Sequence, residues 1–366
     1  MLAAIGLRFA IDGDIVAAER YTGGHINDTY FVSYRCGAHI YRYVHQRINT
    51  TVFCNPYGLS ENVACVTAHI QRKLLAGGVP DAERRVLQLV PARDGSYVLH
   101  TDNGEYWRTY RYVEGTTARL RVNCAQDAYE AARGFGQFAA HLADLPPGML
   151  QETISGFHDT PARFRALLAA IDSDACNRAR QAKPEIAAAI QFEPLSGALL
   201  NFARTHDVPV RAAHNDTKIT NVLFDQETGQ ALCIVDLDTV MPGLLLYDVG
   251  ELIRTSATTA AEDEPDPGKV SVDPELFEAV AAGFLCGSQS LCSAAERSAF
   301  VMAGKVLAFE NGIRFLTDYL EGDRYFRVHR SGHNLDRARA QFSVAASLES
   351  QEEELQRRVE RASQAA

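Results

Sequence analysis

The sequence has little positive charge for its size. Its 366 residues contain 36 Lys and Arg against 46 Asp and Glu, which gives a formal net charge of −10 at pH 7. Nucleic-acid phosphates repel such a chain, so we expect no nucleic-acid partner, although a local basic cleft stays compatible with this composition. No motif implies a protein partner.

Long apolar runs and paired cysteines are also missing. No uninterrupted apolar stretch is long enough to span a bilayer, so we expect no membrane association. The first seven residues are apolar, but Arg8 follows them and no charged segment precedes them, so the pattern of a secretory signal is incomplete. The eight cysteines include no Cys-x-x-Cys pair, which indicates reduced, mostly buried thiols. We therefore expect a cytoplasmic protein.

The hydrophobic pattern changes once along the chain. Up to about residue 113 it is rich in strand-like alternation, with one helical segment at 60–76. From residue 116 onwards helical spacing dominates, apart from the segment 208–238. We predict an α+β, two-lobed fold: a small mixed β-sheet lobe over 1–115, a larger mainly helical lobe over 116–366, and a hinge near 112–116.

A β-hairpin is predicted within this helical region. Two apolar runs, 222–224 and 231–235, flank a polar segment that contains Gly229, where a turn needs positive φ. We expect the turn to centre near Thr228.

Polar residues flank the open end of this hairpin. Antiparallel pairing around Thr228 places Asn221 opposite Asp236, so an amide oxygen and a carboxylate converge. Hard oxygen ligands of this kind suit Mg²⁺ when phosphates complete its coordination. Asp238 points the same way on an extended segment, so it joins Asp236 at the metal or reaches a substrate, unless it is only a turn residue.

A polar loop, His-Asn-Asp-Thr-Lys at 214–218, precedes the hairpin. The order His-x-Asp-x-Lys-x-x-Asn, a hairpin and then Asp resembles the catalytic loop and metal-binding segment of the protein-kinase-like superfamily. Two further segments, Val-Asp-Leu-Asp-Thr-Val-Met-Pro-Gly at 235–243 and Tyr-Asp-Val-Gly at 247–250, resemble the aminoglycoside phosphotransferase and choline kinase group.

Other segments resemble one branch of that group, the bacterial N-acetylhexosamine 1-kinases. They are Gly-Gly-His-Ile-Asn-Asp-Thr-Tyr at 23–30, Phe-His-Asp-Thr at 157–160 and Arg-Phe-Leu-Thr-Asp-Tyr-Leu at 314–320. The resemblance extends from residue 23 to about 326. It implies that ATP and N-acetylglucosamine or N-acetylgalactosamine react to give the sugar 1-phosphate and ADP, with Mg²⁺ as cofactor.

The chemistry of phosphoryl transfer suggests a role for each loop residue. Asp216 is expected to accept a hydrogen bond from the attacking hydroxyl and to take its proton. Lys218 can neutralise charge on the γ-phosphoryl group. His214 is expected to shape the loop through backbone bonds, and Asp248 to brace it.

The nucleotide candidates lie in the first lobe. Paired glycines before strand residues suit close approach of the backbone to a phosphate, although they also suit an ordinary hairpin turn. The superfamily's phosphate-binding lysine has no counterpart on the strand 39–48, so Arg47 is the candidate; its alternative is a surface arginine. The hinge is expected to bind adenine through its backbone. The candidate residues are Gly23, Gly24, His25, Asn27, Arg47, Tyr112, Val113 and Glu114.

Candidates for the sugar side rest on resemblance alone. They are His158, Arg314, Asp318 and Tyr319, together with Asp216 and Asp238. Ion pairing on a helix surface is the alternative for Arg314 and Asp318, and Asp159 is explained as a helix N-cap. Two rival functions stay open: a kinase of another small alcohol, namely a hexose, choline, homoserine or an aminoglycoside, and a nucleotide-binding pseudokinase or interaction module.

Overall fold

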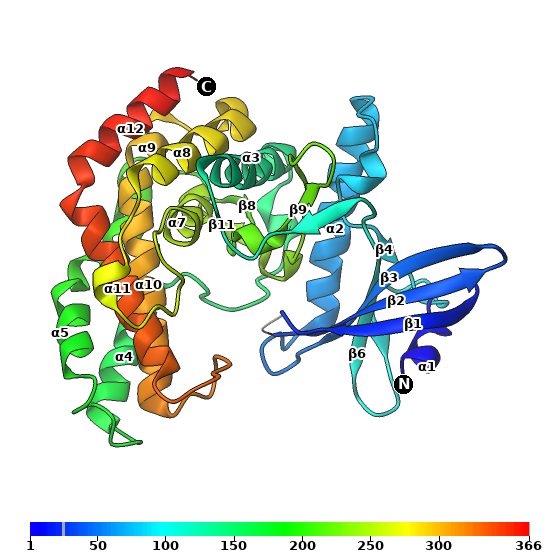
Figure 1. Ribbon diagram of the computed structural model, residues 1–366, viewed down its shortest axis with the longest axis horizontal. Coiled ribbons are helices and arrows are strands. Elements are labelled where there is room, and N and C mark those ends of the chain that lie inside the picture. Colours follow the sequence, from blue (N-terminus) through cyan, green and yellow to red (C-terminus); the bar gives the residue numbers. More distant parts are fainter. Residues whose placement is uncertain (24–25, 366) are drawn as a thin grey trace. The chain divides into compact units, whose positions relative to one another are not determined.

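The computed structural model describes residues 1–23 and 26–365, which form two compact units (Figure 1). The sheet unit comprises Met1–Thr117, Asp144–Ser155 and Leu223–Pro242, and the helical unit comprises Ala118–Ala143, Gly156–Val222 and Gly243–Ala366. The first crossing between the units lies two residues beyond the predicted boundary at 115. The α+β fold, with a small sheet part and a larger helical part, is confirmed.

The sheet unit is built on an antiparallel sheet with strand order β1-β2-β3-β6-β4, in which β5 also pairs with β6. Strand β3 lies beside β6, and this register sets Gln46 opposite Arg108 and Arg47 opposite Trp107. The Trp107 side chain is fully buried in the core of this unit. The elements are α1 (Leu2–Gly6), β1 (Asp14–Tyr21), β2 (Asp28–Cys36), β3 (His39–Ile48), α2 (Pro56–Ala76), η1 (Ala82–Arg84), β4 (Leu89–Val90), β5 (Leu99–His100) and β6 (Tyr106–Arg111).

Later segments of the chain complete the sheet unit. A second small sheet has the strand order β10-β9-β7. The strands of this second sheet are β7 (Thr116–Ala118), β9 (Val222–Asp225) and β10 (Ala231–Ile234). Three further elements lie in the later segments of the chain: η2 (Pro147–Met149), η5 (Leu237–Thr239) and β11 (Met241–Gly243).

The helical unit packs its longest helix, α10, against α11, α7 and α4. Its elements are α3 (Ala125–Leu142), α4 (Thr160–Ser173), α5 (Lys183–Gln191), η3 (Glu193–Gly197), α6 (Ala198–Thr205), β8 (Arg211–Ala213), η4 (Ile219–Asn221), α7 (Leu245–Ser256), η6 (Pro267–Lys269), α8 (Pro274–Ser288), η7 (Gln289–Leu291), α9 (Ala294–Ser298), α10 (Phe300–Glu321), α11 (His333–Ser350) and α12 (Glu352–Ala365).

Helices α3 and α8 approach each other closely because α8 carries glycines at the contact. A Cβ atom at Gly283 would overlap the backbone carbonyl of Tyr129, and one at Gly287 would overlap that of Arg133. Helix α4 begins as predicted, since Asp159 is its N-cap and accepts a hydrogen bond from the Ala162 N–H at 2.9 Å.

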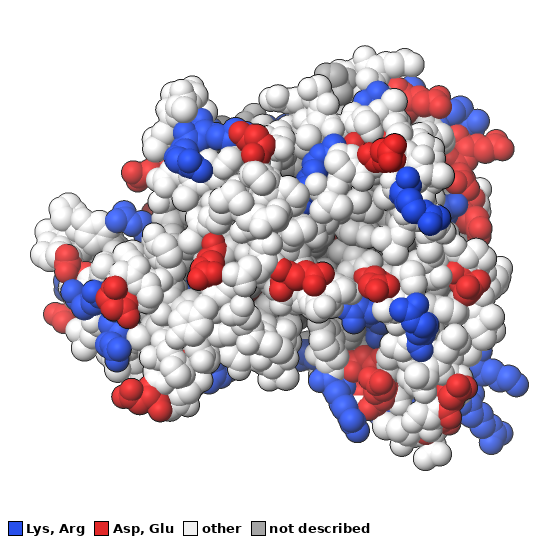
Figure 2. All heavy atoms as spheres, turned by 180° about the vertical axis from the view of Figure 1, so that it is seen from behind, with Lys and Arg blue, Asp and Glu red and all other residues white. Residues whose placement is uncertain are grey.

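The surface carries charged side chains of both signs. On the face drawn in Figure 2, basic and acidic side chains are interspersed. Within the described residues, no single helix has both the length and the apolar character needed to cross a bilayer; Lys183–Gln191 and Glu193–Thr205 meet that test only as a pair bent by 52°.

Candidate active site

The loop after β8 is held by a buried carboxylate on α7. The two Asp248 oxygens accept hydrogen bonds from the backbone N–H groups of His214 at 3.0 Å and Asn215 at 2.7 Å. The Thr217 hydroxyl donates to the Asp248 carbonyl at 2.6 Å. The predicted bracing role of Asp248 is therefore confirmed. Burial raises the pKa of Asp248 to about 6, against the lowering effect of the two backbone hydrogen bonds.

Asp216, Lys218 and Asn221 lie together on this loop. The Lys218 ammonium is 2.9 Å from one Asp216 oxygen, and the Asn221 amide donates to the other at 3.3 Å and to the Asp216 carbonyl at 2.9 Å. Burial alone would raise the pKa of Asp216, but Lys218, then His214 and Arg254, outweigh it and hold the pKa below its usual value. Burial acts against the charge of Lys218, but Asp216 and then Glu251 outweigh it and raise the pKa of Lys218. The loop therefore presents an ionised carboxylate beside a cation.

Two histidines shape the loop from inside. His214 is fully buried against Phe135 and Phe138, and its Nδ1 atom accepts the Asp216 backbone N–H at 3.3 Å, as predicted. His158 lies 3.1 Å from the Asn215 carbonyl through Nε2 and 2.8 Å from Glu310 through Nδ1.

Glu310 is a part of this support that sequence reasoning missed. Its second oxygen accepts the Thr160 hydroxyl at 2.6 Å, and the side chain is buried in the middle of α10. Burial would raise the pKa of Glu310, but His158 outweighs it and lowers the pKa. A glutamate inside a mostly apolar helical stretch is the sequence signal that could have revealed it.

The predicted hairpin forms, with its turn slightly earlier than expected. Gly229 has φ of 68°, and the Asp225 N–H donates to the Gln230 carbonyl at 2.9 Å. This pairing centres the turn between residues 227 and 228, half a residue before the predicted centre at Thr228. Asp236 therefore lies two residues beyond the end of β10, in a left-handed conformation with φ of 59°. Asn221 belongs to the helical unit and Asp236 to the sheet unit, so their shared metal site stays a prediction.

Asp238 is buried in the sheet unit between two partners. One oxygen lies 2.5 Å from Nη2 of Arg108, and the other accepts the Asn27 amide at 2.7 Å. The backbone carbonyl of Asp238 accepts the Thr153 hydroxyl at 2.8 Å. The contact with Arg108 is an ion pair but not an aligned hydrogen bond, so that oxygen of Asp238 has no hydrogen-bond partner.

The predicted phosphate-binding residues are only partly brought together. Asn27 reaches Asp238 and also accepts the Asn49 N–H at 2.9 Å. Arg47 instead pairs with Asp28 and, at 2.5 Å, with Glu105. Gly23 lies at the end of β1 beside the Tyr21 ring, whereas Gly24 and His25 lie outside the described residues.

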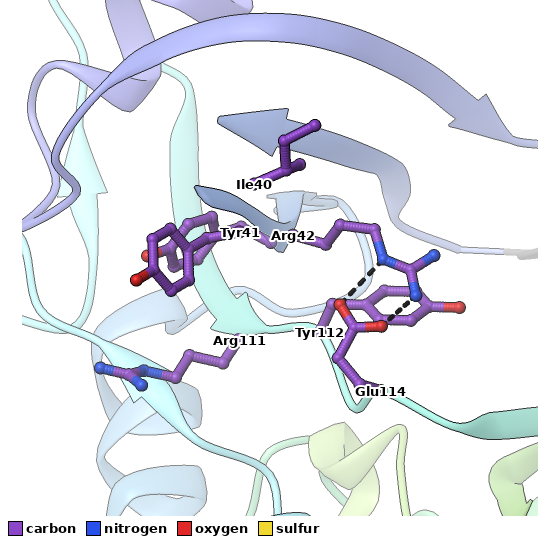
Figure 3. Close-up of a pocket in the computed structure, with 7 residues that line it drawn as sticks. Ile40, Tyr41, Arg42, Arg111, Tyr112 and Glu114 are labelled. Carbon is purple, nitrogen blue, oxygen red and sulfur yellow. Dashed lines mark hydrogen bonds and ion pairs between the residues drawn. The ribbon is translucent and has the colours of Figure 1, made fainter. Parts of the chain in front are cut away.

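The hinge candidates border a shallow pocket of about 460 Å³ lined by Ile40, Tyr41, Arg42, Tyr43, Arg111, Tyr112 and Glu114 (Figure 3). Arg42 lies 4.0 Å from the Tyr112 ring centre and pairs with Glu114. The Val113 carbonyl accepts the Thr116 hydroxyl at 2.7 Å. The Glu114 side chain is therefore engaged with Arg42, and adenine binding by the hinge stays a prediction.

Three of the sugar candidates make contacts within the helical unit, and their contact with a sugar stays a prediction. Both ring nitrogens of His158 are bonded as described above. Asp318 is buried and accepts backbone N–H groups of residues 324–326 and the Asn334 amide. Tyr319 is buried, with the Arg178 guanidinium 4.8 Å from its ring centre. Resemblance in a local segment did not reveal which side chains point inwards.

Arg314 is the sugar candidate whose guanidinium is not tied into such a network. It lies 5.1 Å from the Phe157 ring centre and 5.6 Å from that of Phe326, with a 3.5 Å contact to Asn311. The alternative for Arg314, an ion pair on the helix surface, does not appear among its contacts in the described structure.

Comparison with known proteins defines the class. The profile of a family described as the phosphotransferase enzyme family matches residues 17–273, and the chain belongs to this family. The prediction of a phosphotransferase enzyme is thereby confirmed.

Solved structures share the fold at low sequence identity. A microcompartment-associated aminopropanol kinase has a TM-score of 0.60 and 16% identity, with 95% of each chain covered. A spectinomycin phosphotransferase in complex with ADP and spectinomycin has a TM-score of 0.56 and 12% identity, with 92% of this chain and 94% of the other covered. A choline kinase from Cryptosporidium parvum has a TM-score of 0.55 and 12% identity, with coverages of 97% and 95%.

Proposed function

We propose that this enzyme transfers the γ-phosphoryl group of ATP to the anomeric hydroxyl of an N-acetylhexosamine, N-acetylglucosamine or N-acetylgalactosamine, and forms the sugar 1-phosphate. The observation that carries the proposal is the ionised, partly exposed Asp216 carboxylate on a loop braced by Asp248. The resemblance of the segments 23–30, 157–160 and 314–320 to N-acetylhexosamine 1-kinases supports the choice of sugar.

The loop residues then have distinct tasks in the proposed reaction. Asp216 accepts a hydrogen bond from the sugar hydroxyl, aligns its oxygen with the γ-phosphorus and takes the proton as the new bond forms. Lys218 holds Asp216 in its ionised form and places positive charge near the transferred group. Arg314 is the candidate for contacting the sugar.

The residues present fit a magnesium ion bound together with nucleotide phosphates. Asn221, Asp236 and Asp238 supply the hard oxygens that Mg²⁺ prefers, and Arg108 and Asn27 hold the Asp238 carboxylate in place. No group of three or more His, Cys, Asp or Glu side chains could form an all-protein cage in the described part of the chain. Asn221 and Asp236 would hold the ion, which supplies charge neutralisation at the phosphates when bound.

The acceptor is tested by measuring ATP consumption with a panel of N-acetylhexosamines, hexoses, choline, homoserine and aminoglycosides. We expect turnover with an N-acetylhexosamine, and ³¹P NMR of the product should show an anomeric phosphate. Asp216→Asn is the loss-of-function variant, and Asp172→Asn, which changes an exposed aspartate on α4, is its matched control. Turnover with another alcohol alone would reject the sugar assignment, and ATP binding without acceleration by any acceptor would favour a binding module.

A further inference from the structure

A fully buried arginine lies at the centre of the sheet unit's functional residues. Arg108, on β6, is 1% exposed, and its guanidinium faces Asp238. Its Nε and Nη2 atoms both donate to the Gln46 side-chain oxygen, at 2.9 and 2.7 Å. Gln46 in turn donates to the Thr29 hydroxyl at 3.0 Å. The guanidinium plane is therefore fixed by the neighbouring strands.

One end of this guanidinium makes no hydrogen bond to the described residues. Nη1 of Arg108 is buried and makes no hydrogen bond within the described structure. A buried charged donor without an acceptor is unfavourable, and such groups are rare in folded proteins. Because Gln46 and Asp238 engage only the Nε and Nη2 side of the fork, Nη1 is left as a donor for an incoming oxygen.

Arg108 lies where residues of the proposed nucleotide site converge. Asp238 links it to Asn27, which follows the glycine segment at the end of β1. The charge of Asp236 also acts on the Arg108 guanidinium. The strand register shows why Arg47 is not equivalent: successive side chains of β3 point to opposite faces, so Gln46 faces Arg108 while Arg47 faces Asp28 and Glu105.

We propose that Arg108, instead of a β3 residue, is the cation that binds the nucleotide phosphates, with its Nη1 as the donor and Gln46 as a positioning residue. A guanidinium is permanently charged and forks onto phosphate oxygens, so it can serve on β6 where β3 offers no lysine. The inference rests on the proposed use of ATP and adds the residue that recognises its phosphate chain.

The test compares the binding of ADP, AMP and adenosine to the full chain by calorimetry, with and without Mg²⁺. The variants are Arg108→Lys and Arg108→Gln, and Arg47→Gln removes the rival cation of β3. Because Arg108→Gln leaves Asp238 without its ionic partner, the double variant Arg108→Gln with Asp238→Asn restores a neutral pair. Circular dichroism verifies the fold of each variant.

Without Mg²⁺, where Asp238 has no metal ion to bind, we expect Arg108→Gln and the double variant to weaken ADP binding by about tenfold to a hundredfold, because a charge-assisted hydrogen bond is lost. The affinity of these variants for adenosine should stay within about twofold of that of the unchanged chain. The ADP affinity of Arg108→Lys should lie between those of the unchanged chain and Arg108→Gln. A loss of ADP affinity in Arg47→Gln alone would overturn the inference, as would an equal loss of ADP, AMP and adenosine in the Arg108 variants. If the unchanged chain bound none of the three, the proposed function itself would fail.

Discussion

Replacing Asp248 with asparagine should change how the stability of the enzyme depends on pH. The Asp248 side chain is 2% exposed and accepts the His214 and Asn215 N–H groups. Burial nevertheless raises its pKa from 3.8 to about 6, and the charged groups acting on it, His158 and Glu251, have opposing effects. The folded state therefore binds a proton at Asp248 more readily than the unfolded chain does.

The sign and size of the effect follow from linkage. A carboxyl whose pKa is raised on folding contributes stability that is complete below about pH 4 and is lost as the pH rises through about 6. A change in pKa from 3.8 to about 6 corresponds to about 3 kcal/mol between the two protonation states. Asparagine does not titrate, so Asp248→Asn lacks this dependence, although it leaves one backbone N–H facing an amide N–H₂ group.

Urea unfolding of both chains at half-unit steps between pH 4 and 7.5 measures the effect. The free energy of unfolding of the unchanged chain, minus that of Asp248→Asn, should fall by about 2.5 kcal/mol across this range, because part of the effect is already lost at pH 4. Taking the difference removes the contributions of the other carboxylates. A flat difference would refute the reasoning, and a difference that grows with pH would mean that the two backbone hydrogen bonds outweigh burial.

Further predictions concern the loop and the helix packing. Asp216→Asn should lower kcat by about 10²-fold or more with nucleotide affinity nearly unchanged, and steady-state kinetics with full activity would remove it from the mechanism. Glu310→Gln should lower the free energy of unfolding by about 1–3 kcal/mol in urea, because the buried His158 loses its charged partner, and an unchanged value would contradict this support. Gly287→Ala should lower the free energy of unfolding by about 1–3 kcal/mol, because its Cβ atom overlaps the α3 backbone. Gly148→Ala, which has open space around it, is the control and should have the same melting temperature as the unchanged chain.

The local features of the site were predictable because they depend on short-range sequence signals. The polar segment around Gly229 dictated the hairpin, since a turn with positive φ favours glycine. The cap at Asp159 followed from the residue type and the proline after it. The loop that carries His214 and Asp216 was predictable from the order of its residues, without knowledge of contacts to distant segments.

Features that depend on packing between distant segments were not predictable in the same way. The sequence distance between Arg108 and Asp238 is large, and only the strand register shows that Gln46 and not Arg47 shares their face. Asp318 was assigned to substrate from a local segment, but its partners are backbone groups of the loop that follows α10. Burial decides such roles, and burial depends on the whole fold.

The repeated crossing of the chain between its two units limits what a fragment of this enzyme can do. A peptide that stopped near residue 115 would lack the segments 144–155 and 223–242, and with them the aspartate that accompanies Arg108. The complementary peptide would carry those segments without the sheet they belong to. Separate expression of the two halves, or replacement of one half by that of a relative at a single junction, should therefore yield insoluble or inactive protein. A chimaera needs to exchange all three segments of the sheet unit, 1–117, 144–155 and 223–242, together.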